Sequence, residues 1–73
     1  MKLPYNNGYQ EGLVYGQTDR TTGHSNRPTY SSTYKKGIAG YDYSYGDRTQ
    51  YRTVFQEGFR EGYARGYNEG YRR

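Results

Sequence analysis

The chain has 73 residues, 11 basic and 7 acidic side chains, a net charge of +4 and no cysteine. This length allows one small domain, and the lack of cysteine excludes disulfides and thiolate metal sites. Aliphatic residues are scarce, so a core would have to be built largely from the 12 tyrosines. We expect such a core to be shallow and to rely on oligomerisation.

A first helix is predicted at residues 4–20, where a ring or leucine recurs every four residues with a glycine directly before most of them. Residues four apart lie on one helix face, so the large side chains form a ladder beside a glycine strip. Pro4 suits a first helical turn. The ladder consists of Tyr5, Tyr9 and Leu13, and the strip of Gly8, Gly12 and Gly16.

Residues 21–28 combine glycine, proline and short polar side chains, so they are predicted to be a connection. His24, the only histidine, is interpreted as a solvated imidazole because no second metal ligand lies near it in the sequence. A second helix is predicted at 29–44, with Gly37 and Gly40 inside it. The alternation of Tyr and polar residues at 41–45 also fits a strand, and helix and strand both remain open there.

The third and longest helix is predicted at 47–72, with Asp47 as its N-cap. It carries the most regular form of the repeat, in which four glycines each precede an aromatic residue. Its ladder consists of Tyr51, Phe55, Phe59, Tyr63, Tyr67 and Tyr71, and its strip of Gly58, Gly62, Gly66 and Gly70. The predicted fold is all-α, a small arrangement of three helices with a long C-terminal helix bearing a Tyr/Gly tetrapeptide repeat.

The glycines are the feature that needs an explanation, because each costs about 1 kcal/mol relative to alanine inside a helix. Close approach of a second backbone or a tyrosine ring to the bare strip would offset that cost. Since the third helix is longer than the other two, we expect Tyr63, Tyr67 and Tyr71 to remain for another copy of the chain. The ladders and strips, including Tyr5, Tyr9, Gly8 and Gly12, are therefore the predicted self-association site, giving a homo-oligomer or filament.

A second fold hypothesis is open at this stage. Aromatic residues four apart also share one face of a β-strand, and chains rich in Tyr and Gly include aggregation-prone segments. A β or amyloid-like assembly of strands is therefore the alternative to the helical fold.

No motif for catalysis, metal binding, phosphate binding or a cofactor is present, so we expect a structural protein without enzymatic activity. Binding of single-stranded nucleic acid or another anionic polymer is the alternative function, with arginines as phosphate ligands and Tyr63, Tyr67 and Tyr71 as stacking platforms. The acids at 57, 61 and 69 alternate with these arginines and weaken that hypothesis. No apolar run is long enough to span a membrane.

One resemblance concerns residues 5–16 and 41–71. The segments Asn7-Gly8-Tyr9-Gln-Glu-Gly12, Tyr45-Gly46-Asp47-Arg48, Phe55-Gln-Glu-Gly58-Phe59, Gly62-Tyr63 and Gly66-Tyr67 carry it. They resemble small exported proteins of soil bacteria that have Tyr-x-x-Gly repeats near the C-terminus and no assigned activity. The resemblance implies a location outside the cell or in the cell envelope. The chain departs from that pattern at 17–40, where Thr and Ser replace more charged sequence.

Overall fold

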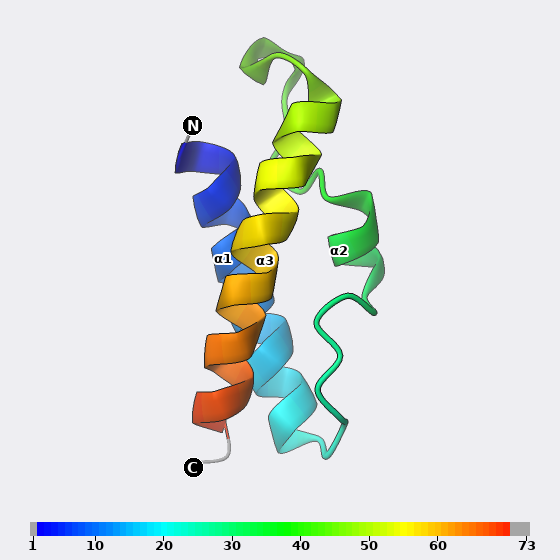
Figure 1. Ribbon diagram of the computed structural model, residues 1–73, viewed down its shortest axis with the longest axis vertical. Helices are drawn as coiled ribbons and strands as arrows, with labels where there is room; N and C mark the ends of the chain where they lie inside the picture. Colours follow the sequence, from blue (N-terminus) through cyan, green and yellow to red (C-terminus); the bar gives the residue numbers. More distant parts are fainter. Residues whose placement is uncertain (1, 71–73) are drawn as a thin grey trace.

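The computed structural model describes residues 2–70 (Figure 1). Its elements in chain order are α1 (Lys2–Thr21), α2 (Ser32–Lys36), a 3₁₀ helix η1 (Tyr43–Tyr45) and α3 (Arg48–Gly70). No strand occurs within the described range. The predicted all-α fold with a long C-terminal helix is confirmed, and the β alternative does not describe this chain.

The two long helices lie side by side and run in the same direction (Figure 1). Gly8, near the start of α1, faces Phe55, whereas Gly16, two turns further on, faces Tyr63. The contacts therefore advance together along both helices, which is the order of a parallel pair. A parallel pair cannot be joined by a tight turn, so residues 22–47, here called the connector, must return along the length of the helices.

The observed ends of the two long helices lie close to the ends predicted from the sequence. Observed α1 extends a little beyond the predicted 4–20, and Pro4 lies buried in its first turn. Asp47 is confirmed as the N-cap of α3, because its Oδ1 accepts a hydrogen bond from the amide of Thr49 at 2.9 Å. Residues 71 and 72 of the predicted helix lie outside the described residues.

The helix predicted at 29–44 is wrong in extent, because only Ser32–Lys36 is α-helical. Gly37 ends α2 in the left-handed conformation, with φ 63°, and Gly40 also has a positive φ of 82°. Glycine takes up such angles without steric cost, so Gly37 stops α2 and Gly40 lies in a turn beyond it. Residues 41–45 form neither of the two alternatives: Asp42 caps the short turn η1 by accepting a hydrogen bond from the Ser44 amide at 3.3 Å.

Hydrogen bonds attach the connector to the side of α3. The side-chain Nε2 of Gln56 donates to the backbone carbonyl of Tyr34 at 3.0 Å, and the hydroxyl of Tyr51 donates to the carbonyl of Ala39 at 2.8 Å. Asn7 of α1 donates to the same Tyr51 hydroxyl at 2.9 Å. Tyr51 thus joins α1, the connector and α3 at one end of the molecule.

The core consists of ring side chains enclosed between α3, α1 and the connector. Its four most buried members expose 1% of their surface or less: Tyr51, Phe55, Phe59 and Tyr63. The whole chain exposes 4819 Å², close to the roughly 4,700 Å² expected of a folded monomer of its mass. A single copy therefore encloses its own core, and the expectation that folding needs an oligomer has no support in the packing.

Candidate functional site

The predicted glycine strips lie in the contact between α1 and α3. A methyl group on Gly12 would lie 2.1 Å from the carbonyl oxygen of Phe59, and one on Gly62 would lie 2.1 Å from that of Tyr9. Gly8, Gly16, Gly58 and Gly66 meet backbone carbonyls of the other helix at 2.0 to 2.3 Å in the same way. The helices touch backbone to backbone, an approach that any side chain would prevent and that Cα–H···O contacts accompany.

Gly70, the last predicted strip residue, is different from the others. A methyl group there would first meet side-chain atoms of Arg20, at 2.8 Å, and not a carbonyl. The backbone contact has therefore opened at this end of the pair. Gly16 also belongs to the strip, as its spacing indicates.

The ladder of α3, hereafter the α3 ladder, is buried by the connector and by one tyrosine of α1. Tyr34 meets Phe59 edge-on at 5.5 Å between ring centroids, and Tyr15 lies 5.6 Å from the same ring. Tyr41 and Tyr45 cover Tyr51 at 5.1 and 6.0 Å. The α3 ladder comprises Tyr51, Phe55, Phe59, Tyr63 and the half-buried Tyr67, whereas Tyr71 lies outside the described residues.

Burial of Tyr63 corrects one step of the self-association hypothesis. Its ring is 1% exposed, so it does not remain for another copy of the chain. Its neighbour Tyr67 is half-buried, and the Tyr67 hydroxyl donates to the carbonyl of His24 in the connector at 2.7 Å. The reason is that α1 is long enough, and the connector returns far enough, to cover α3 over these turns. The same burial removes Tyr63 as a stacking platform for nucleic acid, and Arg20 already lies over the Tyr67 ring at 4.7 Å.

The ladder of α1, hereafter the α1 ladder, consists of Tyr5, Tyr9 and Leu13 and is only half-buried. The rings of Tyr5 and Tyr9 stack with centroids 6.3 Å apart. Arg65 of α3 donates to the Tyr9 hydroxyl at 3.1 Å and to Glu69 at 2.9 Å. These hydrogen bonds, the one to Tyr9 first, raise the pKa of Arg65. Both ladders were predicted to belong to one self-association site, but the fold separates them.

The two ladders occupy equivalent positions in the helix pair. Gly8 approaches the carbonyl of Phe55, and reciprocally Gly58 approaches the carbonyl of Tyr5. This exchange relates the helices by an approximate twofold axis parallel to both. Under that relation the α1 ladder is the counterpart of the α3 ladder and lies on the opposite side of the pair, whereas the connector runs along one side only (Figure 1).

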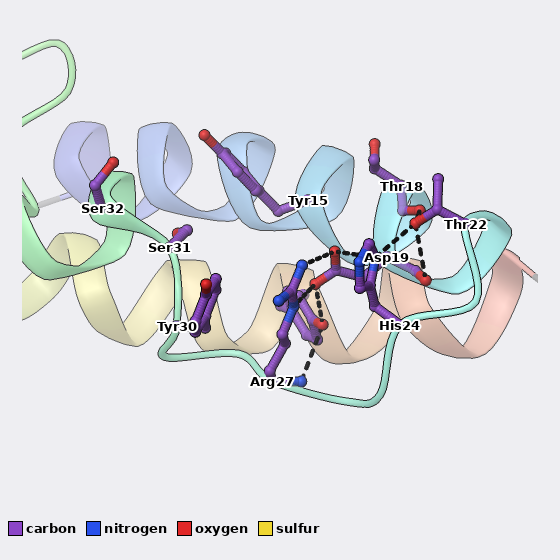
Figure 2. A pocket seen from close by; sticks show the side chains of 10 residues that line it. Tyr15, Thr18, Asp19, Thr22, His24, Arg27, Tyr30, Ser31 and Ser32 are labelled. Atoms are coloured by element: carbon purple, nitrogen blue, oxygen red, sulfur yellow. Dashed lines mark hydrogen bonds and ion pairs between the residues drawn. The ribbon is translucent and has the colours of Figure 1, made fainter.

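A second group of residues, around Asp19, was missed by the sequence analysis. Arg27 donates two hydrogen bonds to the Asp19 carboxylate, from Nε and Nη2 at 3.1 Å each, and Tyr63 donates a third at 2.6 Å. Figure 2 shows this network at the end of α1, beside a pocket whose other wall is the connector. No sequence signal marks it, because an Asp near a helix end and an Arg in a loop are ordinary surface residues.

The pKa values of Asp19 and Tyr63 shift in opposite directions. Asp19 is 7% exposed, but the hydrogen bond from Arg27 outweighs desolvation and lowers the pKa of its carboxyl. Desolvation, followed by the bond to Asp19, raises the pKa of Tyr63 to about 12. The phenol therefore stays protonated and donates to a carboxylate that stays ionised over the ordinary pH range.

The group Thr22, His24 and Asp19 has the residue types of a nucleophilic triad but not the geometry. Nδ1 of His24 lies 2.8 Å from the Thr22 hydroxyl and 3.7 Å from Asp19. In a triad the base contacts its nucleophile through one ring nitrogen and its orienting acid through the other. Here a single nitrogen makes both contacts, and Thr22 already donates to the carbonyl of Thr18 at 2.7 Å.

No family model, characterised protein or solved structure matches this chain. None of its described helices is both long and apolar enough to cross a membrane.

Proposed function

We propose that this protein is a non-enzymatic assembly module that associates with itself through the α1 ladder. The observation that supports the proposal is the unequal covering of two equivalent ladders. One side of the pair receives Tyr15 and the connector, and the other receives the polar side chain of Arg65. The apolar surface of Tyr5, Tyr9 and Leu13 is therefore the part of the repeat that remains for a partner.

The surroundings of the α1 ladder favour a second copy as that partner. Glu57, Glu61 and Arg60 line a hollow of about 410 Å³ beside Tyr5, and Arg65 lies next to Tyr9. Because both signs of charge are present on this face, two copies related by a twofold axis can pair unlike charges around the rings. One such face per chain gives a closed dimer, and a filament would require a second surface.

Association through this face can be measured by sedimentation velocity. An interface of this extent buries less than about 1,000 Å² and is weak, so we expect monomer and dimer to exchange between about 10 μM and 1 mM. Tyr5→Glu places a third acid beside Glu57 and Glu61 and should leave a helical monomer. Tyr43→Glu is the matched control, because Tyr43 is 86% exposed and lies in η1.

The proposal fails if the parent stays monomeric over that range, or if both variants dimerise equally. The dependence on salt concentration distinguishes self-association from the alternative, binding of nucleic acid. Binding to a single-stranded oligonucleotide should weaken steeply as salt rises, whereas a dimer held by tyrosine rings should be unchanged or strengthened.

Export is part of the proposal and is supported only by the resemblance of the repeats to small exported proteins. Fractionation of cells that express the natural gene tests it. We expect the protein in the medium or the envelope fraction, and recovery with the cytosolic proteins alone would contradict export.

A further inference from the structure

The pocket beside Asp19 is a hollow of about 400 Å³ between the end of α1 and the connector. It lies away from the α1 ladder, so self-association does not use it. Pockets that hold small ligands measure about 300 to 1,000 Å³, and this one falls in that range. Rings of Tyr15 and Tyr30 form part of its walls, and Arg27 and the hydroxyls of Ser31 and Ser32 are among its polar lining (Figure 2).

Arg27 is held rigidly in this pocket with part of its guanidinium unused. Asp19 occupies Nε and Nη2, while the ring of Tyr30 lies 4.2 Å from the guanidinium carbon. No hydrogen bond within the described residues uses Nη1. A guanidinium presents donors along more than one edge, and the edge formed by the two terminal nitrogens matches a carboxylate bidentately. The Asp19 contact fixes the orientation of that edge in advance.

The acceptors around Arg27, in contrast, are already engaged. Both carboxylate oxygens of Asp19 accept hydrogen bonds, and the Tyr63 hydroxyl accepts one from the backbone amide of Arg27 at 3.0 Å. The Tyr15 hydroxyl is paired with Thr33 at 2.8 Å. A ligand entering here finds a guanidinium donor and few free acceptors, so it has to bring acceptor atoms of its own.

The charge of the surroundings selects an anion. Asp19 and Arg27 neutralise each other, Lys35 lies 5.8 Å from the Tyr30 ring centroid, and the chain as a whole carries +4. Positive potential raises the local concentration of anions. The flat tyrosine walls, which carry apolar area, favour a ligand whose body is also flat and apolar.

From this geometry we propose that the pocket between α1 and the connector is a binding site for a small aromatic carboxylate. The carboxylate group would pair with the Nη1 and Nη2 edge of Arg27, and the ring would pack against Tyr15 and Tyr30. Tyr63 and Asp19 act as positioning residues, since both hold Arg27 without touching the ligand.

The test uses benzoate as the probe and benzamide as a neutral molecule of the same shape, each titrated into the full chain and followed by amide NMR shifts. We expect saturable shifts confined to residues 15–35 and to the turn of α3 around Tyr63, with benzoate binding at about millimolar Kd. Benzamide should bind at least about tenfold more weakly, because it lacks the charge that a guanidinium pairs with. Equal binding of the two probes, or shifts scattered over other arginines, would overturn the proposal.

Substitutions test whether benzoate binds at Arg27. Arg27→Lys keeps a positive charge for Asp19 but has no second edge, so benzoate affinity should fall about tenfold or more. Arg48→Lys is the matched control, since Arg48 is an exposed arginine at the start of α3, and it should bind as the parent does. If Arg27→Lys loses its helical circular dichroism, Tyr30→Ala decides instead, because Tyr30 is 61% exposed and its loss removes a wall without disturbing the core. Unchanged affinity in the folded variant refutes the site.

The proposed dimer and the proposed binding site can be tested independently of each other. Tyr5→Glu alters only the α1 ladder, so it should bind benzoate with the affinity of the parent. Loss of benzoate binding in that variant would show that the shifts report on the dimer and would contradict a separate site.

Discussion

Gly62 and its counterpart Gly12 lie in the middle of the contact between the backbones of α1 and α3. A glycine inside a helix costs about 1 kcal/mol, and here the missing side chain is what allows the contact. The carbonyl of Tyr9 occupies the space that a methyl group on Gly62 would need, at 2.1 Å. Backbone atoms cannot move aside as the end of a side chain can, so a substitution must separate the helices.

We expect Gly62→Ala to lower the free energy of unfolding by at least about 2 kcal/mol, although alanine favours the helix itself. Chemical denaturation measures the change. Asn68→Ala, at an exposed position of the same helix, is the control, because it also introduces alanine but adds no atom to the contact between the helices. Similar stability of the two variants would show that the backbones do not touch at Gly62.

Tyr63 gives the stability a dependence on alkaline pH. Its pKa rises from 10.0 to about 12 on folding, so the folded state favours the protonated phenol. The resulting stability is fully present below pH 10 and is lost as the pH rises through 12. A shift of that size corresponds to about 3 kcal/mol.

Denaturation at several pH values should therefore show a steeper loss of stability above pH 10 in the parent than in Tyr63→Phe. Tyr43→Phe provides the comparison for general tyrosine ionisation, since Tyr43 is 86% exposed. If the parent and Tyr63→Phe lose stability in parallel, the Tyr63 hydroxyl is not buried against Asp19 as the structure places it.

Among the elements, the connector has the least regular sequence and the most specific role. It contains only the five-residue α2 and the short turn η1, yet it covers the α3 ladder over its full described length. Tyr34 is its central contact, since its ring packs on Phe59 and its hydroxyl accepts a hydrogen bond from Arg60 at 2.9 Å. The connector therefore depends on α3 for its structure, and α3 depends on it for burial.

Tyr34→Ala should release the connector without separating the helix pair. We expect faster amide hydrogen exchange at residues 29–45, while the glycine contact keeps the central turns of α1 and α3 protected. Tyr45→Ala is a milder control at the edge of the same cover, where the ring is 37% exposed. Uniformly faster exchange throughout the chain would mean that connector and helix pair unfold as one unit.

The sequence was sufficient for the long helices and insufficient for the connector, for physical reasons. The four-residue repeat predicts the ladder and the strip once the segment is taken as helical, and the cap at Asp47 predicts where α3 begins. Gly37 and Gly40 were predicted to lie inside a helix because a sequence pattern does not reveal the sign of φ. The Asp19 pocket depends on a contact between α1, a loop arginine and Tyr63, which no local pattern encodes.

At the scale of the whole molecule, two similar helices form one parallel pair, and the two sides of the pair are covered by different residues. The chain extends over 39 × 19 × 14 Å, so it is a short rod. One side carries the connector and the Asp19 pocket, and the opposite side carries the α1 ladder. The glycine strips that were predicted to form contacts between copies are used within one copy, so the proposed association involves the α1 ladder alone.

The parallel contact of α1 and α3 through glycine is the claim on which the fold, the α1 ladder and the pocket all depend. Nuclear Overhauser effects between glycine Hα protons of α1 and amide protons of α3 test it directly. The structure places the Cβ position of Gly8 at 3.0 Å from the amide nitrogen of Phe59, that of Gly12 at 2.9 Å from Tyr63, and that of Gly16 at 2.8 Å from Tyr67. We therefore predict strong cross-peaks in that order along the chain. Cross-peaks in the reverse order, or none between the two helices, would contradict the account.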